Sequence, residues 1–200
     1  MCAARGSLTL PSPPRGEEKK SKSGPLLSSP QRKEEKKNGG LVLARSALIR
    51  QCKAWRKQNL SIVFTNGVFD ILHHGHLELL TQAAGNGDRL VVGINTDRSV
   101  KRLKGPDRPI NSEKDRTALL ASLRIVDAVC LFGEDTPLEL IKAIRPDVLV
   151  KGSDYAVREI VGAVEVKSWG GRVVRAKLKK VYSSSTTIRR ISKPKRTVRT

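Results

Sequence analysis

The segment that decides the fold is Ile62–Leu80, with the sequence IVFTNGVFDILHHGHLELL. It opens with an apolar run over Ile62–Thr65 that is typical of a buried strand, and from Leu77 it continues with the amphipathic spacing of a helix. Between these parts, two of the histidines of the run His73–His76, namely His73 and His76, flank a glycine at a strand-to-helix junction. A helix N-terminus offers unpaired backbone N–H groups and the positive end of a dipole. The segment therefore predicts a phosphate-binding site.

Further strands and helices alternate along the chain after this segment. Short apolar stretches rich in Val, Ile and Leu predict strands over Ser61–Thr65, Arg89–Asn95, Ala128–Phe132, Val148–Lys151 and Arg172–Lys177. Amphipathic stretches predict helices over Leu77–Ala84, Asp97–Leu103, Ser112–Leu123, Pro137–Ile144 and Glu159–Trp169. This alternation predicts an α/β fold with a doubly wound parallel sheet, in which ligands bind beyond the carboxyl ends of the strands.

The composition divides the 200 residues into one domain with flanks. Residues 1–40 are rich in Pro, Ser, Gly, Lys and Glu, so we expect a disordered, low-complexity leader. Helical spacing of Leu48, Cys52 and Trp55 predicts a basic lead-in helix over 41–59. The domain itself is expected over 60–192, followed by a basic tail over 193–200.

The cysteines and the distribution of apolar residues indicate the cellular compartment of the protein. The chain has three cysteines without metal-like spacing, no signal-type apolar core and no stretch long enough to span a membrane. A cytoplasmic protein is the expectation.

The net charge of +20 invites a second interpretation, a basic nucleic-acid-binding protein. The excess lies mostly in the flanks, with +5 in residues 1–40, +5 in 41–59 and +4 in 193–200, which leaves +6 for 60–192. Aromatic residues make up only 4% of the chain, too few for an array that stacks on bases. Small phosphorylated substrates explain the modest surplus of the domain as well as a polymer does.

Three roles compete for His73 and His76. Imidazoles bind metal ions, but apart from Asp70 no carboxylate or cysteine cluster accompanies this pair. The rings could also pack a helix start, or they could contact nucleotide phosphates, for which the bare backbone of Gly75 leaves room. We favour the phosphates. Asp70 either orients an imidazole or serves as a turn residue.

Three other stretches fall at the predicted functional edge of the sheet. Lys101–Gly105 holds lysines on a glycine-flanked loop, Val150–Tyr155 follows a strand, and Tyr182–Thr187 places hydroxyls before a predicted helix. Lysines and hydroxyls suit phosphate oxygens, although each stretch is also compatible with a solvated loop, a turn or a helix cap.

Together these motifs resemble the cytidylyltransferase-like nucleotidyltransferases over about 60–192. The resemblance is carried by Phe64–Asp70, the His-x-Gly-His run, Arg102–Gly105, Arg108–Asn111, Glu134–Ile141, Arg145–Gly152 and Glu159–Gly162. Within this family the segments are most similar to adenylyltransferases that act on heptose 1-phosphate. The resemblance implies a Rossmann-like domain, Mg²⁺ bound with ATP, and a possible homodimer.

The reaction that the resemblance implies is attack of a sugar 1-phosphate on the α-phosphate of ATP. The implied catalytic residues are His73, His76 and Lys104. The implied nucleotide-binding residues are Thr65, Asn66, Gly67, Phe69, Gly75, Ser183, Ser184, Ser185 and Thr186. We assign the acceptor to Asp70, Asp97, Lys151, Gly152, Asp154 and Tyr155. No metal-ligating residue is assigned, and neither a specific nucleic acid nor a membrane is an expected partner.

Two points stay open in this assignment. The family's Ser-Thr-Thr triplet aligns with Ser183–Ser185 when counted back from Ile188, but with Ser185–Thr187 when letters are matched. The second point is the substrate pair, because a cytidylyltransferase for glycerol 3-phosphate or another polyol phosphate is the alternative within the family.

Overall fold

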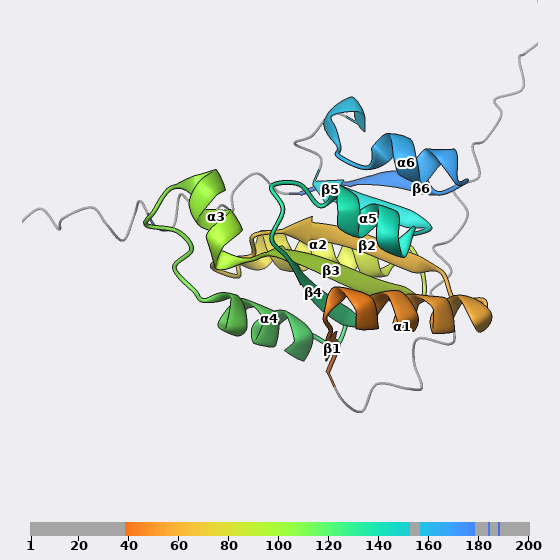
Figure 1. Ribbon diagram of the computed structural model, residues 1–200, viewed down its shortest axis with the longest axis horizontal. Coiled ribbons are helices and arrows are strands. Elements are labelled where there is room, and N and C mark those ends of the chain that lie inside the picture. The colour runs from red at the N-terminus through yellow and green to blue at the C-terminus, as the bar shows by residue number, and fades with distance from the viewer. Residues whose placement is uncertain (1–38, 153–156, 179–183, 185–187, 189–200) are drawn as a thin grey trace, which may run out of the picture.

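The computed structural model describes residues 39–152, 157–178, 184 and 188 (Figure 1). In this part of the chain, six parallel strands form one sheet in the order β1-β4-β3-β2-β5-β6. The strands are β1 (Leu41–Val42), β2 (Ile62–Gly67), β3 (Arg89–Asn95), β4 (Ala128–Phe132), β5 (Val148–Gly152) and β6 (Arg172–Ala176). The doubly wound parallel sheet predicted from the alternating pattern is confirmed.

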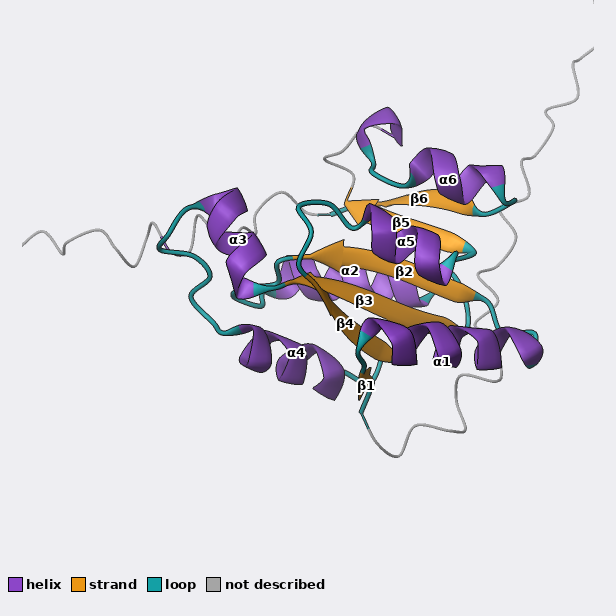
Figure 2. Cartoon of the chain, viewed as in Figure 1, coloured by secondary structure: helices purple, strands orange, loops and turns teal. Residues whose placement is uncertain are grey.

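Helices cover both faces of this sheet, as Figure 2 shows. They are α1 (Arg45–Lys57), α2 (His74–Ala84), α3 (Asp97–Lys104), α4 (Glu113–Ser122), α5 (Leu138–Ile144) and α6 (Ala163–Ser168), with a short 3₁₀ turn at Val157–Glu159. Buried side chains of α1, α5 and α6 form one hydrophobic cluster, and those of α2 and α4 form the other. The described residues exclude most of the predicted leader and all of the predicted basic tail.

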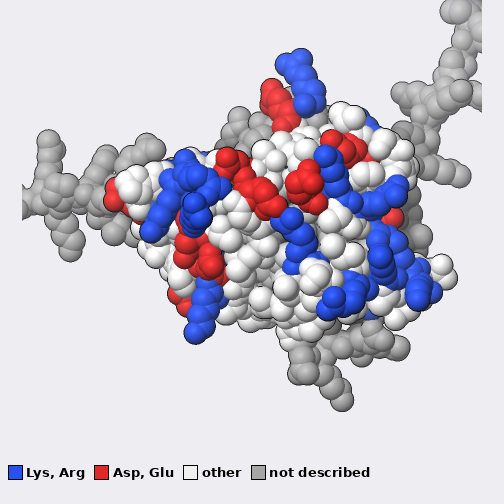
Figure 3. Space-filling view, viewed as in Figure 1, with Lys and Arg blue, Asp and Glu red and all other residues white. Residues whose placement is uncertain are grey.

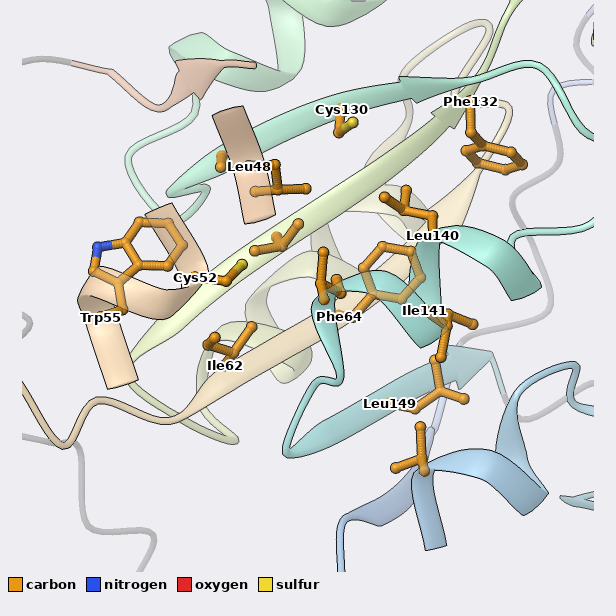
Figure 4. Packing of buried hydrophobic residues seen from close by; sticks show 14 of the residues in the cluster. Leu48, Cys52, Trp55, Ile62, Phe64, Cys130, Phe132, Leu140, Ile141 and Leu149 are labelled. Atoms are coloured by element: carbon orange, nitrogen blue, oxygen red, sulfur yellow. The ribbon is translucent and has the colours of Figure 1, made fainter. Parts of the chain in front are cut away.

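The apolar run of β2 explains why this strand lies at the centre. Ile62 and Phe64 point into the cluster with α1, whereas Val63 points into the cluster with α2. Figure 4 shows Leu48, Cys52 and Trp55 of α1 in the first cluster together with Ile62 and Phe64. Cys130 is fully buried there, as the apolar run around it predicts.

The winding of the chain creates the edge at which a ligand can bind. From β2 the chain moves outward through β3 to β4, and it then returns to the other side of β2 to form β5. The strand order therefore reverses between β2 and β5, and parallel sheets bind ligands beyond the carboxyl ends at such a point. Residues 68–76, with the histidine run, follow directly from the end of β2.

Two predicted helices differ from the structure at their starts. The lead-in helix predicted over 41–59 begins only at Arg45, because Leu41–Val42 instead pair with Ala128–Val129 as an edge strand. The helix predicted from Leu77 begins at His74 with His73 as its N-cap residue, so His76 lies in its first turn. The apolar spacing does not extend into this turn because its histidines are polar.

The helix predicted over Glu159–Trp169 is interrupted at Gly162. This glycine adopts φ +86°, and a Cβ there would lie 2.7 Å from Cδ1 of Ile141. Only a glycine accommodates both the backbone conformation and the close approach of α5. The α-helix therefore begins at Ala163, after the turn.

Charge is unevenly spread over the surface. Figure 3 shows Lys and Arg side chains gathered over α1 and over α3, with acidic side chains between the two groups. Arg50, Lys53 and Lys57 lie exposed on α1, a helix with no acidic residue. In the part of the chain described, no helix has the length and apolarity needed to cross a membrane.

Candidate active site

The end of β2 buries polar atoms that have no partner. Thr65 Oγ1 and Asn66 Oδ1 are both buried, and neither makes a hydrogen bond within the described residues. A buried hydroxyl or amide without a partner costs roughly 1–3 kcal/mol, so such atoms in a native protein call for an explanation. Nδ1 of His76 is a third buried atom of this kind in the same region. A polar ligand at this edge of the sheet would satisfy all three.

Two of the three histidines of the run, His73 and His76, form a stack with Phe69. The rings of His73 and His76 lie face to face, with centroids 3.8 Å apart and planes 12° apart. The ring of Phe69 packs on His76 at 5.1 Å and 57°. Phe69 reaches this position with φ +48°, a left-handed conformation that bulky residues rarely adopt. Gly67 lies beneath, where an added Cβ would stand 3.1 Å from the Phe69 ring.

Burial makes this pair of imidazoles neutral near pH 7. Desolvation lowers the pKa of His73. It also lowers the pKa of His76 from 6.5 to about 4, with the neighbouring His73 adding to the effect and the backbone at Ile71 opposing it. Two parallel rings at this separation do not both hold a positive charge. Each ring therefore carries a single N–H and no fixed charge before a ligand binds, and a hydrogen bond to the backbone of Ile71 already engages His76.

The lowered pKa of His76 predicts a protein that loses stability in mild acid. The unfolded chain binds a proton at His76 below pH 6.5, whereas the folded chain does not until about pH 4. The free energy of unfolding should therefore fall by about 2 kcal/mol between pH 7.5 and pH 5 through this group. Urea denaturation at the two pH values measures the change.

The matched controls for this prediction are two glutamine variants. His76→Gln removes the titrating group and should abolish most of the difference between the two pH values. His74→Gln changes an exposed histidine beside Glu78 and should retain it. An equal pH dependence in His76→Gln and in the wild type would contradict the assignment.

Asp70 connects the loop after β2 with the loop before α4. Its carboxylate accepts hydrogen bonds from Arg108 at 2.8 Å and from the backbone N–H groups of Ile110 and Asn111 at 2.9 Å. Burial alone would raise the pKa of Asp70, but these donors outweigh it and lower the pKa. Asp70 makes no hydrogen bond to either imidazole among the described residues. Its contacts thus correspond to the turn role considered for it rather than to the orienting role.

Sequence reasoning missed Arg116, which the structure places at the centre of this edge. Arg116 is buried in α4, and its guanidinium donates to the carbonyl oxygens of Val68 and Asn95. The sequence holds one signal for it, since Arg116 precedes Leu120 by one helical turn and so falls on the core-facing stripe of a predicted helix. Arg108 and Asn111 were also missed as contacts of Asp70.

The structure places Lys151, Gly152 and Asp97 at or next to neighbouring strand ends. Lys151 Nζ, from the end of β5, donates to the carbonyl of Asn66 at 3.1 Å, and Gly152 is the buried last residue of that strand. Asp97, at the start of α3, accepts from Arg116 at 2.7 Å. Lys104 ends α3 with an exposed side chain, and Gly75 is buried in the first turn of α2.

The hydroxyl run is described only in part. Ser184 Oγ donates to the carbonyl of Ile71 at 3.0 Å, which brings this residue to the loop that carries the histidines. The remaining predicted residues lie outside the described residues, namely Ser183, Ser185, Thr186, Asp154 and Tyr155. The register of the Ser-Thr-Thr triplet therefore stays a prediction.

The described residues offer no set of side chains that would hold a resident metal ion. Among the described residues there is no group of three or more His, Cys, Asp or Glu side chains that could hold a metal ion. Mg²⁺ commonly binds through substrate phosphates with few protein ligands.

Comparison with known proteins gives consistent matches. The profile of the cytidylyltransferase-like family matches residues 64–191. "Bifunctional protein HldE" of Methylobacillus flagellatus is 54% identical over 146 residues, which are 73% of this chain and 30% of that protein. HldE of Koribacter versatilis is 55% identical over 147 residues, 74% of this chain and 30% of that protein. The chain thus spans about a third of the length of the curated relatives that it matches.

A solved structure shares the fold. The crystal structure of a lipopolysaccharide core biosynthesis protein from Thermoplasma volcanium is 31% identical to this chain, with a TM-score of 0.50. The match covers 62% of this chain and 99% of that one. The matched part of this chain therefore corresponds to nearly the whole length of that solved chain.

Proposed function

We propose that this chain, which belongs to the cytidylyltransferase-like family of nucleotidyltransferases, transfers AMP from ATP to D-glycero-β-D-manno-heptose 1-phosphate. The products would be ADP-heptose and pyrophosphate. The names of the HldE relatives support this choice of acceptor, as does the similarity to the lipopolysaccharide core biosynthesis protein from Thermoplasma volcanium. The family and the type of enzyme do not depend on that choice.

One observation carries the proposal, the cluster of buried polar atoms at the β2–α2 junction that have no hydrogen-bond partner among the described residues. Thr65 Oγ1, Asn66 Oδ1 and His76 Nδ1 lie where the strand order reverses. A nucleotide presents hydroxyls, ring nitrogens and phosphate oxygens, which are the partners that such atoms need. The helix that follows begins with no acidic residue in its first turn and no side-chain cap at His73, which leaves its positive end available to an anion.

The chemistry of the proposed step is a single displacement. An oxygen of the sugar 1-phosphate attacks the α-phosphorus of ATP, a new P–O bond forms, and the bond to the β-phosphate breaks with its electron pair leaving on pyrophosphate. The protein supplies no nucleophile in this scheme. Its contribution is to orient two polyanions and to stabilise the charge that develops on the phosphates.

Binding of the nucleotide would change the charge of the histidines. A bound triphosphate raises the imidazole pKa because negative charge favours the protonated ring, and a protonated His76 can donate from Nδ1 to a phosphate oxygen while its other N–H faces Ile71. Lys104, exposed at the end of α3, provides a mobile point charge that can reach the acceptor phosphate or the leaving pyrophosphate. Mg²⁺ would enter with ATP and neutralise part of the phosphate charge.

Pyrophosphate release tests the proposal. The protein is supplied with ATP or CTP and with heptose 1-phosphate, glycerol 3-phosphate or another polyol phosphate, in the presence of Mg²⁺. The proposal expects release with ATP and heptose 1-phosphate at least tenfold above every other pair. Release only with CTP and glycerol 3-phosphate would overturn the proposed substrates and establish the alternative within the family.

A further inference from the structure

Arg116 is a charged residue at a position where charge is costly. It is only 1% exposed, and it is the largest fully buried side chain of the described residues. Burying a guanidinium is unfavourable unless its N–H groups are paired with acceptors. The residue lies on α4, which provides none of the predicted ligands of the nucleotide. Its burial needs another explanation.

The partners of Arg116 come from three separate pieces of the chain. The guanidinium donates to Val68 O at 2.6 Å, to Asn95 O at 2.8 Å and to Asn111 O at 3.1 Å. It also donates to the carboxylate of Asp97 at 2.7 Å, which neutralises its charge. One side chain thus ties the segment after β2 to the end of β3 and to the loop before α4.

The contact with Val68 acts on the histidine stack. Val68 directly precedes Phe69, whose left-handed backbone brings its ring onto His76. Such a conformation persists only where the surroundings hold it. Arg116 holds the carbonyl before Phe69, and Asp70, directly after it, is held by the 108–111 loop. The strained residue is therefore fixed from both sides.

We propose that Arg116 is a positioning residue for His76, which it acts on through Val68 and Phe69. The kinetic consequence of this role rests on the proposed function. Lysine is not an equivalent donor, because a single ammonium lacks the planar set of five N–H groups that reaches four acceptors at once. Arg116→Lys keeps a positive charge beside Asp97, but its single ammonium cannot make all four hydrogen bonds of the guanidinium.

The test compares Arg116→Lys with Arg172→Lys. Arg172 is a fitting control because its guanidinium also donates to two oxygens, the side-chain and backbone oxygens of Asn86, but it lies exposed at the start of β6, outside every stretch assigned to the site. Circular dichroism at 10 °C and thermal unfolding establish that each variant is folded. We then measure kcat and KM for ATP, together with the NMR titration of the His76 imidazole.

We expect Arg116→Lys to be folded, to lose at least 30-fold in kcat with KM for ATP within threefold, and to shift the His76 titration upward by at least one pH unit. Arg172→Lys should match the wild type in all three measurements. A folded Arg116→Lys with unchanged kcat and an unchanged His76 titration would overturn the proposal.

A second variant guards against misfolding. If Arg116→Lys does not fold, Arg116→Gln takes its place, since an amide can still donate to two carbonyls. If neither variant folds at 10 °C, Arg116 serves the folding core and the proposal is overturned. The NMR titration needs no substrate, so it tests the positioning role even if the wild type transfers no AMP to the proposed acceptor.

Discussion

Replacement of His76 by alanine should lower turnover by about 100- to 1,000-fold, because it removes a preorganised donor to the phosphates in a buried site. His76 lies between His73 and Phe69 in the stack and belongs to the first turn of α2. The alanine variant therefore removes an imidazole from the proposed phosphate-binding site and also removes the ring on which His73 and Phe69 pack. Steady-state pyrophosphate release measures the effect, with far-UV circular dichroism confirming that the variant is folded.

The run itself provides the matched control. His74 lies between the two stacked histidines in sequence, yet its side chain is 55% exposed and faces Glu78 one turn along the helix. His74→Ala should therefore retain turnover within threefold of the wild type. Turnover of His76→Ala within threefold of the wild type, in a folded protein, would contradict the role of the stack.

The second large effect is expected on stability. Asp70→Ala should lower the free energy of unfolding by about 3 kcal/mol, because it removes a buried carboxylate and leaves the Arg108 guanidinium and two backbone N–H groups without their acceptor. Urea denaturation at pH 7.5 measures this change. The same variant should lose activity, since the anchored loop and the Phe69 backbone share this contact.

Asp135→Ala is the control for that prediction. Asp135 also pairs with an arginine, Arg102 at 2.7 Å, but on the surface, where such a pair contributes about 0–1 kcal/mol. A loss from Asp70→Ala no larger than the loss from Asp135→Ala would show that the 108–111 loop does not depend on this carboxylate.

Much of the fold could be predicted because local patterns specify it. The β-branched runs indicated all five longer strands, and Ser112 caps α4 as its position before Glu113 indicates. Leu41–Val42 was missed because two residues carry no periodicity and are ordered by their pairing with β4. The first turn of α2 was missed because His74 and His76 are polar and do not continue the apolar spacing of the helix.

For the candidate site, the sequence predicted only which residues follow the ends of the strands. The sequence indicated which polar residues follow the strands, and the structure brings Thr65, Asn66, His76 and Lys151 to one edge. It did not indicate the contacts that hold them. Arg116 and Val68 are separated by 48 positions, and Asp70 and Ile110 by 40, so no local pattern connects them. Such links arise from the winding of the sheet.

The most direct test of the central claim follows the oxygen atoms of the acceptor. The protein is supplied with ATP, Mg²⁺ and heptose 1-phosphate whose phosphate oxygens carry ¹⁸O, and the products are identified by mass spectrometry. Attack of the sugar phosphate on the α-phosphorus predicts ADP-heptose that retains the label and pyrophosphate that has none. Unlabelled ADP-heptose, label in pyrophosphate, or a sugar bisphosphate formed with ADP would contradict the account.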